Sequence, residues 1–125
     1  MDIAFTEREL DVMDVLWEHG ASTVAEVQES LADELAYTTV LTILRTLEEK
    51  GYVTHEEEGR AYRYSPEVER SEAGASAVKR LMRKLFRGSP ELLLTQLVSQ
   101  RGLTREQLQE MRRMLDERID REARQ

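Results

Sequence analysis

The fold of this chain is decided by residues 36–53, which read AYTTVLTILRTLEEKGYV. At about 100° per residue, the apolar residues of this stretch fall on one side of a helix, and mainly threonine and arginine fall on the other. The apolar side consists of Val40, Ile43, Leu44 and Leu47, and the outer side of Thr38, Thr42, Arg45 and Glu49, with Leu41 and Thr46 between them. The pattern predicts a helix over residues 37–50, closed by Gly51, because glycine is the common residue just after a helix C-terminus.

The outer side of this helix is rich in threonine, which is a poor helix former. An ordinary surface helix would have Glu, Lys and Gln in these positions. Threonine is short, forms hydrogen bonds and carries a methyl group, which suits contact with DNA base edges, and arginine suits guanine or phosphate. Two interpretations stay open from this helix alone: a helix that reads DNA, or a β-branched core helix with an incidental polar side.

Two further helices are expected before this one. Residues 6–9 have the Thr-x-x-Glu form of a capping box, and residues 23–26 repeat it. Apolar residues at helical spacing follow each box, as far as His19-Gly20 in the first case and the region 31–35 in the second. Three helices with a short second and a polar-faced third are typical of a helix-turn-helix.

After Gly51 the pattern changes from helical to alternating. We expect two strands at residues 52–56 and 61–65, joined by a turn at residues 57–60. A hairpin directly after such a helix is a wing, and Arg60 and Arg63 are its candidate phosphate contacts. The alternative is a plain two-stranded edge that completes the core.

The charge of the chain is divided unevenly along its length. The net charge is −7 overall, −11 for residues 1–70 and +4 for residues 71–125. The candidate DNA helix lies in the acidic part, so its binding must depend on a few local cations and should show a modest salt dependence. The same acidity supports a different class of function, in which an acidic winged helix binds a protein rather than DNA.

Beyond Pro66 we expect three amphipathic helices. One apolar stripe ends at Gly88, a second helix begins at Ser89-Pro90, and a third begins at the capping box of residues 104–107. So short a region cannot bury all of its leucine, which favours an identical partner chain related by a two-fold axis. The expected dimerisation residues are Leu81, Leu85, Phe86, Leu93, Leu97, Leu108, Met111 and Leu115.

These observations predict a mainly α fold with a small β-hairpin. A winged helix-turn-helix domain is expected at residues 1–67, followed by a three-helix dimerisation region at residues 68–125. Two alternatives stay open for the second part. It could pack back on residues 1–65 in a monomer, or it could form a ligand-sensing pocket, since Met and Leu stripes sometimes line cavities.

The composition excludes several kinds of chemistry. The absence of cysteine excludes disulfides, cysteine nucleophiles and thiolate metal sites. His19 and His55 are the two histidines, and structural roles are expected for both. With no catalytic triad order and no phosphate-binding glycine loop, we expect no enzyme activity, no cofactor and no metal. No signal peptide or membrane-length apolar run is evident, so we expect a cytoplasmic location.

Several stretches of the chain resemble the penicillinase-repressor (BlaI/MecI-type) family. They are AYTTV at 36–40, LEEKGYVTH at 47–55, GRAYRY at 59–64 and LFRGS at 85–89. The resemblance implies a homodimeric bacterial transcriptional repressor. Its winged helix would bind a palindromic operator, often built around TACA/TGTA, and its C-terminal helices would dimerise.

The resemblance also implies a membrane sensor protease as a partner, which relieves repression by cleavage. In the family that the chain resembles, the members that are cleaved have an Asn-Phe pair at the cleaved bond, and this chain has Gln96-Leu97 at that position. The copper-responsive members have a cluster of cysteines, and this chain has no cysteine. Neither a β-lactam that acts through such a protease nor copper is therefore supported as the inducer. Leu41 stands where some members resemble arginine, and an exposed leucine there should favour a thymine methyl group.

The double-stranded operator is thus the expected partner, bound by two sets of residues. Those expected in the major groove are Thr38, Thr39, Leu41, Thr42 and Arg45. Those expected on phosphates are Tyr37, Thr46, Lys50, Arg60 and Arg63.

Overall fold

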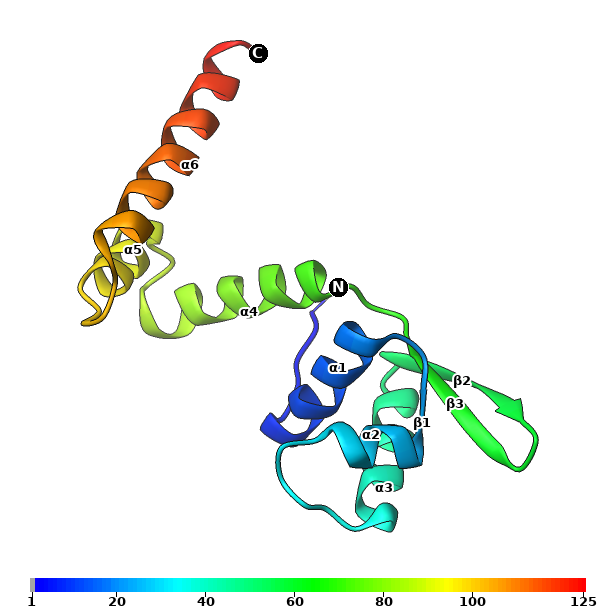
Figure 1. The fold of residues 1–125 in the computed structure, drawn as a ribbon. Helices are drawn as coiled ribbons and strands as arrows, with labels where there is room; N and C mark the ends of the chain where they lie inside the picture. The colour runs from blue at the N-terminus through cyan, green and yellow to red at the C-terminus, as the bar shows by residue number, and fades with distance from the viewer. Residues whose placement is uncertain (1) are drawn as a thin grey trace. The chain divides into compact units, whose positions relative to one another are not determined.

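The computed structural model describes residues 2–125 (Figure 1). Its elements are α1 (Glu7–His19), β1 (Ser22–Thr23), α2 (Val24–Ser30), α3 (Tyr37–Glu49), β2 (Val53–Glu58), β3 (Ala61–Pro66), α4 (Arg70–Leu85), α5 (Pro90–Val98) and α6 (Arg105–Ala123). The mainly helical fold with a small antiparallel sheet is confirmed. The chain forms two compact units that divide after Lys79, within α4.

The expected capping boxes form at the starts of α1, α2 and α6. In the first, the Thr6 hydroxyl accepts from the Glu9 backbone N–H at 3.1 Å, and the Glu9 carboxylate accepts from the Thr6 N–H at 2.8 Å. The boxes Thr23/Glu26 and Thr104/Gln107 repeat this exchange. Because each box satisfies amides that the helix leaves without partners, these three starts lie where the sequence places them.

The sheet has three strands in the order β1-β3-β2, and both pairings are antiparallel. The hairpin is longer than expected, because Glu57 and Glu58 continue β2 and only Gly59-Arg60 remains as the turn. Gly59 has a φ of +63°, which glycine adopts without strain and which suits a two-residue hairpin turn. Strand β1 was not predicted, since two residues carry no alternating pattern.

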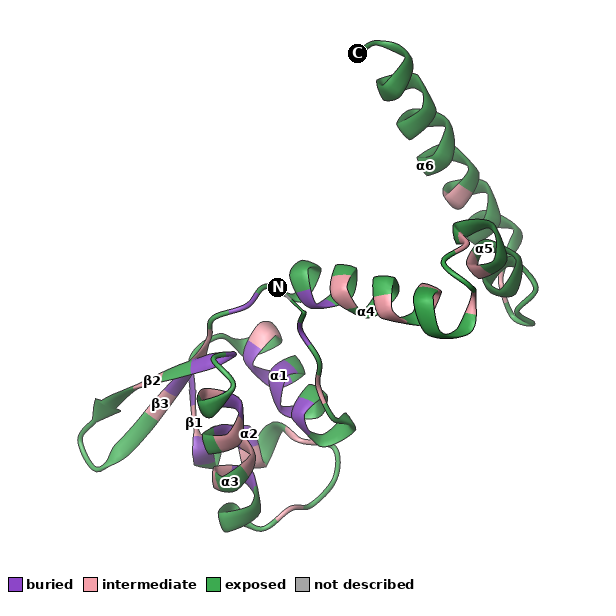
Figure 2. Ribbon diagram, turned by 180° about the vertical axis from the view of Figure 1, so that it is seen from behind, coloured by how far each residue is buried: buried purple, intermediate pink, exposed green. Residues whose placement is uncertain are grey.

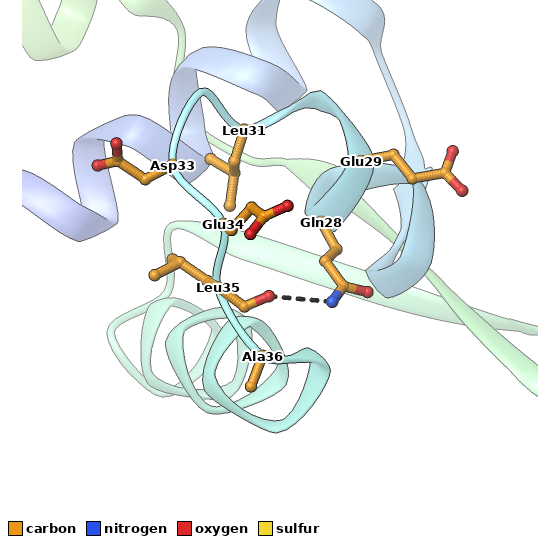
Figure 3. A pocket seen from close by; sticks show the side chains of 7 residues that line it. All are labelled: Gln28, Glu29, Leu31, Asp33, Glu34, Leu35 and Ala36. Atoms are coloured by element: carbon orange, nitrogen blue, oxygen red, sulfur yellow. Dashed lines mark hydrogen bonds between the residues drawn. The ribbon is translucent and has the colours of Figure 1, made fainter.

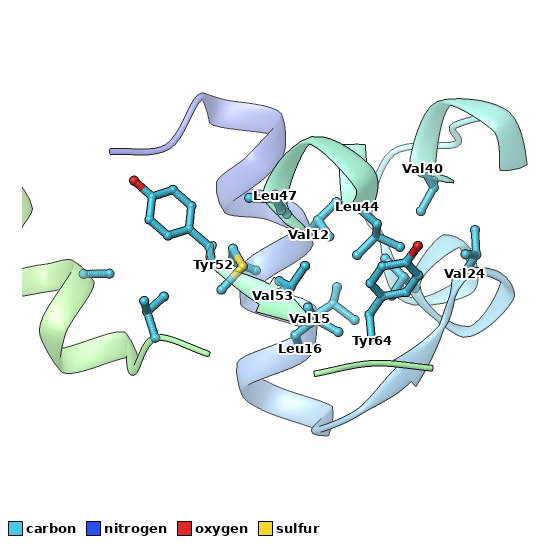
Figure 4. Packing of buried hydrophobic residues seen from close by; sticks show 14 of the residues in the cluster. Val12, Val15, Leu16, Val24, Val40, Leu44, Leu47, Tyr52, Val53 and Tyr64 are labelled. Carbon is cyan, nitrogen blue, oxygen red and sulfur yellow. The ribbon is translucent and has the colours of Figure 1, made fainter. Parts of the chain in front are cut away.

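The core of the first unit lies between α1, α2, α3 and the sheet (Figure 4). Val40, Leu44 and Leu47 of α3 are fully buried, which confirms the expected inner side of that helix. Ile43 is only half-buried and packs at the edge of the core. The other fully buried large side chains are Val12, Met13, Leu16, Val27 and Tyr64.

The first part of α4 belongs to the same unit, because it packs on α1. The Trp17 indole N–H donates to the Val68 carbonyl at 2.9 Å, and the Arg70 guanidinium lies 4.9 Å from the centre of the Trp17 ring. Arg70 also pairs with Asp14 at 2.8 Å and with Glu18 at 3.0 Å. The compact unit therefore extends past residue 67, where the sequence places the domain boundary; the division of function between the two domains stays a prediction.

The second unit contains no buried side chain among its described residues (Figure 2). Its apolar side chains lie along α5, α6 and the end of α4, and most of the large ones are exposed. The exposed set includes Leu81, Leu85, Leu92, Leu94, Leu97, Val98, Leu108, Met114, Leu115 and Ile119. Of the described helices, none is long and apolar enough to cross a membrane.

Candidate nucleic-acid interface

The outer side of α3 is open to solvent, as the pattern predicts. Thr38, Thr39, Thr42 and Arg45 are exposed, and Tyr37 at the start of the helix is 49% exposed. The inner side of the same helix is anchored in the core, so these five side chains are held in fixed directions on one surface. This surface, defined by these five residues, is called the α3 face below.

Threonine hydroxyls on α3 are already engaged with the helix backbone. Thr42 donates to the Thr38 carbonyl at 2.9 Å, and Thr46 donates to the Thr42 carbonyl at 3.0 Å. With the proton used in this way, the exposed Thr42 presents its methyl group and the lone pairs of its oxygen. Such a side chain can contact a thymine methyl or accept from an amino group in the major groove. Thr46 is half-buried and lies off the α3 face.

The expectation that Leu41 is an exposed leucine was wrong. Leu41 is half-buried and packs against the core cluster. Its position between the two sides of the helix allowed either outcome, and the gain from removing an isobutyl group from water decides for packing. The exposed part of Leu41 can still contact a base in the major groove, but its polar neighbours make up most of the exposed side of α3.

The N-terminus of α3 has no capping side chain. Ala36 is the N-cap and forms no side-chain hydrogen bond, whereas α1, α2, α5 and α6 begin with a capping threonine or serine. The first-turn amides of α3 therefore have no side-chain partner, and the positive end of the helix dipole lies beside Tyr37. A phosphate oxygen is the group that such amides bind most readily.

The connection between α2 and α3 is fixed by two polar contacts. The Gln28 side-chain amide donates to the Leu35 carbonyl at 2.9 Å (Figure 3). Arg8 of α1 pairs with Asp33 at 2.7 Å. An open hollow is lined by this connection and the end of α2, and Glu29, Asp33 and Glu34 are among its lining residues. These carboxylates would repel an anionic ligand in the hollow. The contacts Gln28–Leu35 and Arg8–Asp33 hold the chain that leads into α3.

Arg63, an expected phosphate contact, is used within the chain. Its guanidinium pairs with Glu58 across the hairpin and with Glu26 of α2 at 3.0 Å, and it donates to the Ala21 carbonyl at 3.0 Å. Two carboxylates thus compensate its charge, and the pKa of Glu26 is lowered, mainly by hydrogen bonds from Thr23 and further by Arg63. These contacts hold the wing against α2, and the contact of Arg63 with phosphate stays a prediction.

Lys50, another expected phosphate contact, is paired as well. Its ammonium lies 2.7 Å from Oε2 of Glu9. Glu9 is only 4% exposed. Burial raises the pKa of the Glu9 carboxyl, but hydrogen bonds from Lys50 and from the Thr6 backbone outweigh it, so the pKa is lowered overall. The pair joins the end of α3 to the start of α1, which is a structural task.

We expect Glu9→Gln to lower the free energy of unfolding by about 1 kcal/mol at pH 7, because the variant loses a charge-assisted hydrogen bond. A lowered carboxyl pKa contributes stability that is present above the unfolded pKa, about 4.3, and is lost as the pH falls through the folded pKa. The difference between Glu9→Gln and the unsubstituted protein should therefore shrink below about pH 4. Urea unfolding at several pH values measures it, with exposed Glu7→Gln as control; a difference independent of pH would contradict the assignment.

The cations left for DNA are few. Arg8, Lys50, Arg63 and Arg70 all form ion pairs within the first unit. Among the described residues of that unit, no ion pair or hydrogen bond is found for the side chains of Arg45, on the α3 face, or of Arg60, at the wing tip. Internal pairing leaves the acidic net charge of this part of the chain unchanged, and it leaves two arginines available for a ligand.

A polar contact that sequence reasoning missed joins the wing to α3. Nδ1 of His55, on β2, lies 2.7 Å from Oε2 and 2.8 Å from Oε1 of Glu48. The sequence places His55 beside Glu56 on a strand and gives no sign of a partner seven residues away on the preceding helix. The contact depends on how the hairpin folds back over α3, which no local pattern reports.

The structure gives little support for a ligand-sensing pocket. The hollow at the start of α6, lined by Leu103, Glu106, Gln107, Glu110 and Met111, is a shallow depression of the surface. Within residues 2–125, no group of His, Cys, Asp and Glu is arranged to hold a metal ion.

Comparison with known proteins agrees with this arrangement. The penicillinase repressor family model matches residues 5–117. The penicillinase repressor of Bacillus licheniformis is 25% identical over 118 residues, which cover 93% of this chain and 92% of that protein. The transcriptional regulator BlaI of Mycobacterium tuberculosis is 38% identical over 95 residues, which cover 73% of this chain and 69% of that protein.

The first unit also matches a solved structure. The solution structure of the DNA-binding domain of the repressor BlaI aligns with a TM-score of 0.51 and 32% sequence identity, over 57% of this chain and 89% of that domain. The family match spans nearly the whole chain and includes both units. Its named members are repressors of transcription and not enzymes. The chain belongs to the penicillinase repressor family.

Proposed function

We propose that the chain is a homodimeric transcriptional repressor, located in the cytoplasm, that binds a palindromic operator. In each half-site α3 lies in the major groove and the wing lies beside the backbone. The observation that carries this proposal is the α3 face: a helix anchored by three fully buried residues presents threonines and an unpaired arginine to solvent. The fold and the family of repressors to which the chain belongs support the same assignment.

The contacts to DNA divide into two kinds. Thr38, Thr39, Thr42 and Arg45 are placed to meet base edges, because they lie on the exposed side of a helix that fits the major groove. Phosphates are met by the first-turn amides of α3, by Tyr37 and by Arg60 at the wing tip. Leu41 and Thr46 border this surface, while Lys50 and Arg63 fix the elements that carry it.

The two-fold association rests on the second unit. None of its described side chains is buried in a single chain, although leucine, methionine and valine recur along α5 and α6. Leaving so much apolar surface in water is unfavourable, and an identical copy covers it most simply. The residues proposed to meet the partner are Leu81, Leu85, Phe86, Leu93, Leu97, Leu108, Met111 and Leu115.

Selection of random double-stranded DNA by the purified protein tests the function, followed by footprinting of the enriched sequence. We expect a palindrome with half-sites about one helical turn apart, or a multiple of that distance. The net charge of −11 over residues 1–70 favours a second candidate, an acidic winged helix that binds a protein. Recovery of no common sequence would favour this candidate over the repressor.

We expect Arg45→Ala to weaken operator binding by about 10- to 100-fold, corresponding to roughly 1–3 kcal/mol, and to relax preference at one base position. The guanidinium is unpaired in the free protein, so its removal leaves the fold intact and removes a direct contact. Gel-shift titration against the operator and its single-base variants measures both effects. Arg101→Ala, an exposed arginine of the second unit, is the matched control; unchanged binding by Arg45→Ala would show that α3 faces the groove differently.

Cleavage by a membrane sensor protease gains no support from Gln96 and Leu97. Both residues lie in the last turn of α5, which ends at Val98. Proteolysis favours exposed loops and termini, where the chain can extend into the protease. Cleavage at this pair would first require the last turn of α5 to unfold.

A further inference from the structure

The contact between Glu48 and His55 lies next to the proposed base-reading arginine. Glu48 lies near the end of α3, and both oxygens of its carboxylate are within hydrogen-bond distance of Nδ1 of His55. A carboxylate only accepts, so Nδ1 of His55 carries the hydrogen. The two side chains are 31% and 33% exposed, which means that the contact is partly shielded from water.

Aromatic side chains of β3 hold the imidazole in place. The centre of the His55 ring lies 4.7 Å from that of Tyr62 and 5.3 Å from that of Tyr64. Tyr64 is fully buried in the core, so the imidazole rests on a rigid support. The partner of the Glu48 carboxylate is therefore an imidazole that the wing holds in position, and not a flexible surface side chain.

Arg45 lies close enough to compete for this carboxylate. It precedes Glu48 by three residues on the same helix, and side chains at this spacing are neighbours that form ion pairs. The pKa of the Tyr64 hydroxyl agrees with this proximity: burial raises it most, the negative charge of Glu48 raises it further, and the positive charge of Arg45 lowers it. Yet Glu48 is bonded to His55, and no ion pair is found for Arg45 among the described residues.

We infer that His55 is a positioning residue for DNA binding: it engages the Glu48 carboxylate and thereby keeps Arg45 free for the operator. This inference rests on the proposed function, which places Arg45 in the groove. Without the imidazole, Glu48 turns to Arg45, and a DNA ligand must then break an ion pair to reach the guanidinium.

The test compares three variants by gel-shift titration on the selected operator. We expect His55→Ala to weaken binding about three- to tenfold. Glu48→Gln alone should bind as well as the unsubstituted protein or better, because a neutral amide no longer competes for Arg45. The decisive variant is His55→Ala with Glu48→Gln, which should return to within about twofold of Glu48→Gln. His55→Gln, whose amide can still donate to Glu48, should lose less than His55→Ala.

The pattern separates positioning from support of the fold. If His55 only stabilised the wing, the double variant would bind as weakly as His55→Ala, and the inference would be overturned. Unchanged binding by His55→Ala would overturn it too. Failure of the proposed function is a different result, since the unsubstituted protein would then select no operator at all. Thermal unfolding of each variant, followed by circular dichroism, shows which losses of binding come from lost structure.

Discussion

Replacing Leu44 by alanine is expected to lower the free energy of unfolding of the first unit by roughly 2–5 kcal/mol. Leu44 is 0% exposed and lies in the middle of α3, where it packs in the core between the helices and the sheet (Figure 4). The truncation removes buried methyl groups and leaves a cavity that the surrounding side chains fill only in part. Since a small domain is stable by only about 5–15 kcal/mol, the loss is a large fraction of the total.

Urea unfolding followed by circular dichroism measures this change, with the variant and the unsubstituted protein compared at one protein concentration. Leu10→Ala is the matched control, because it makes the same chemical change on α1 at a side chain that is 47% exposed. We expect its effect to stay below about 1 kcal/mol, since much less apolar surface leaves water there. Equal losses in the two variants would mean that the inner side of α3 is not the side that packs.

The sequence predicted those features of the first unit that depend on neighbouring residues. The helix starts at Thr6 and Thr23 followed from capping boxes, in which donor and acceptor lie three residues apart. The inner side of α3 was predicted from the helical period. Val40, Leu44 and Leu47 recur at helical spacing and therefore share one side of the helix, and this apolar side is buried. Both kinds of signal are local, which is why they could be found without a structure.

The partners of the charged residues could not be predicted in this way. Lys50 and Glu9 are far apart in the sequence but form an ion pair, and Arg63 meets Glu26 across a similar gap. Ranked by charge and position alone, Lys50 and Arg63 looked like phosphate contacts equal to Arg60. Only the folded arrangement shows which cations already pair with a carboxylate of the same chain; which of them contact phosphate stays a prediction.

Leu41 shows a different reason for an incorrect expectation. Its angle around α3 lies between the buried and the exposed sides, so the helical period alone does not decide its environment. Neighbouring elements decide it, and here they cover enough of the side chain for it to join the core. Residues at the border of a helix face are thus the ones whose role in DNA contact must be measured rather than derived.

Leu115→Glu should abolish the dimer and lower the affinity for the full palindrome by at least about 100-fold. Leu115 is 49% exposed on α6, on the same side as Leu108 and Met111, and a carboxylate there would be buried without a partner on association. Two linked binding units gain 10²–10⁴ in affinity over one, because the second half-site is met at high effective concentration. A monomer loses that gain while each half-site contact stays intact.

Sedimentation velocity over a range of concentrations, together with gel shifts on a full and a half palindrome, tests this expectation. Affinity for the half palindrome should be nearly unchanged, because the α3 face is not altered. Gln109→Glu adds the same charge to the polar side of α6 and should leave both the dimer and the affinity intact. If Leu115→Glu remained dimeric, the apolar side of α6 would not be the two-fold interface. If it became monomeric yet bound the full palindrome normally, the operator would be read by single chains, and the exposed leucines would need another partner.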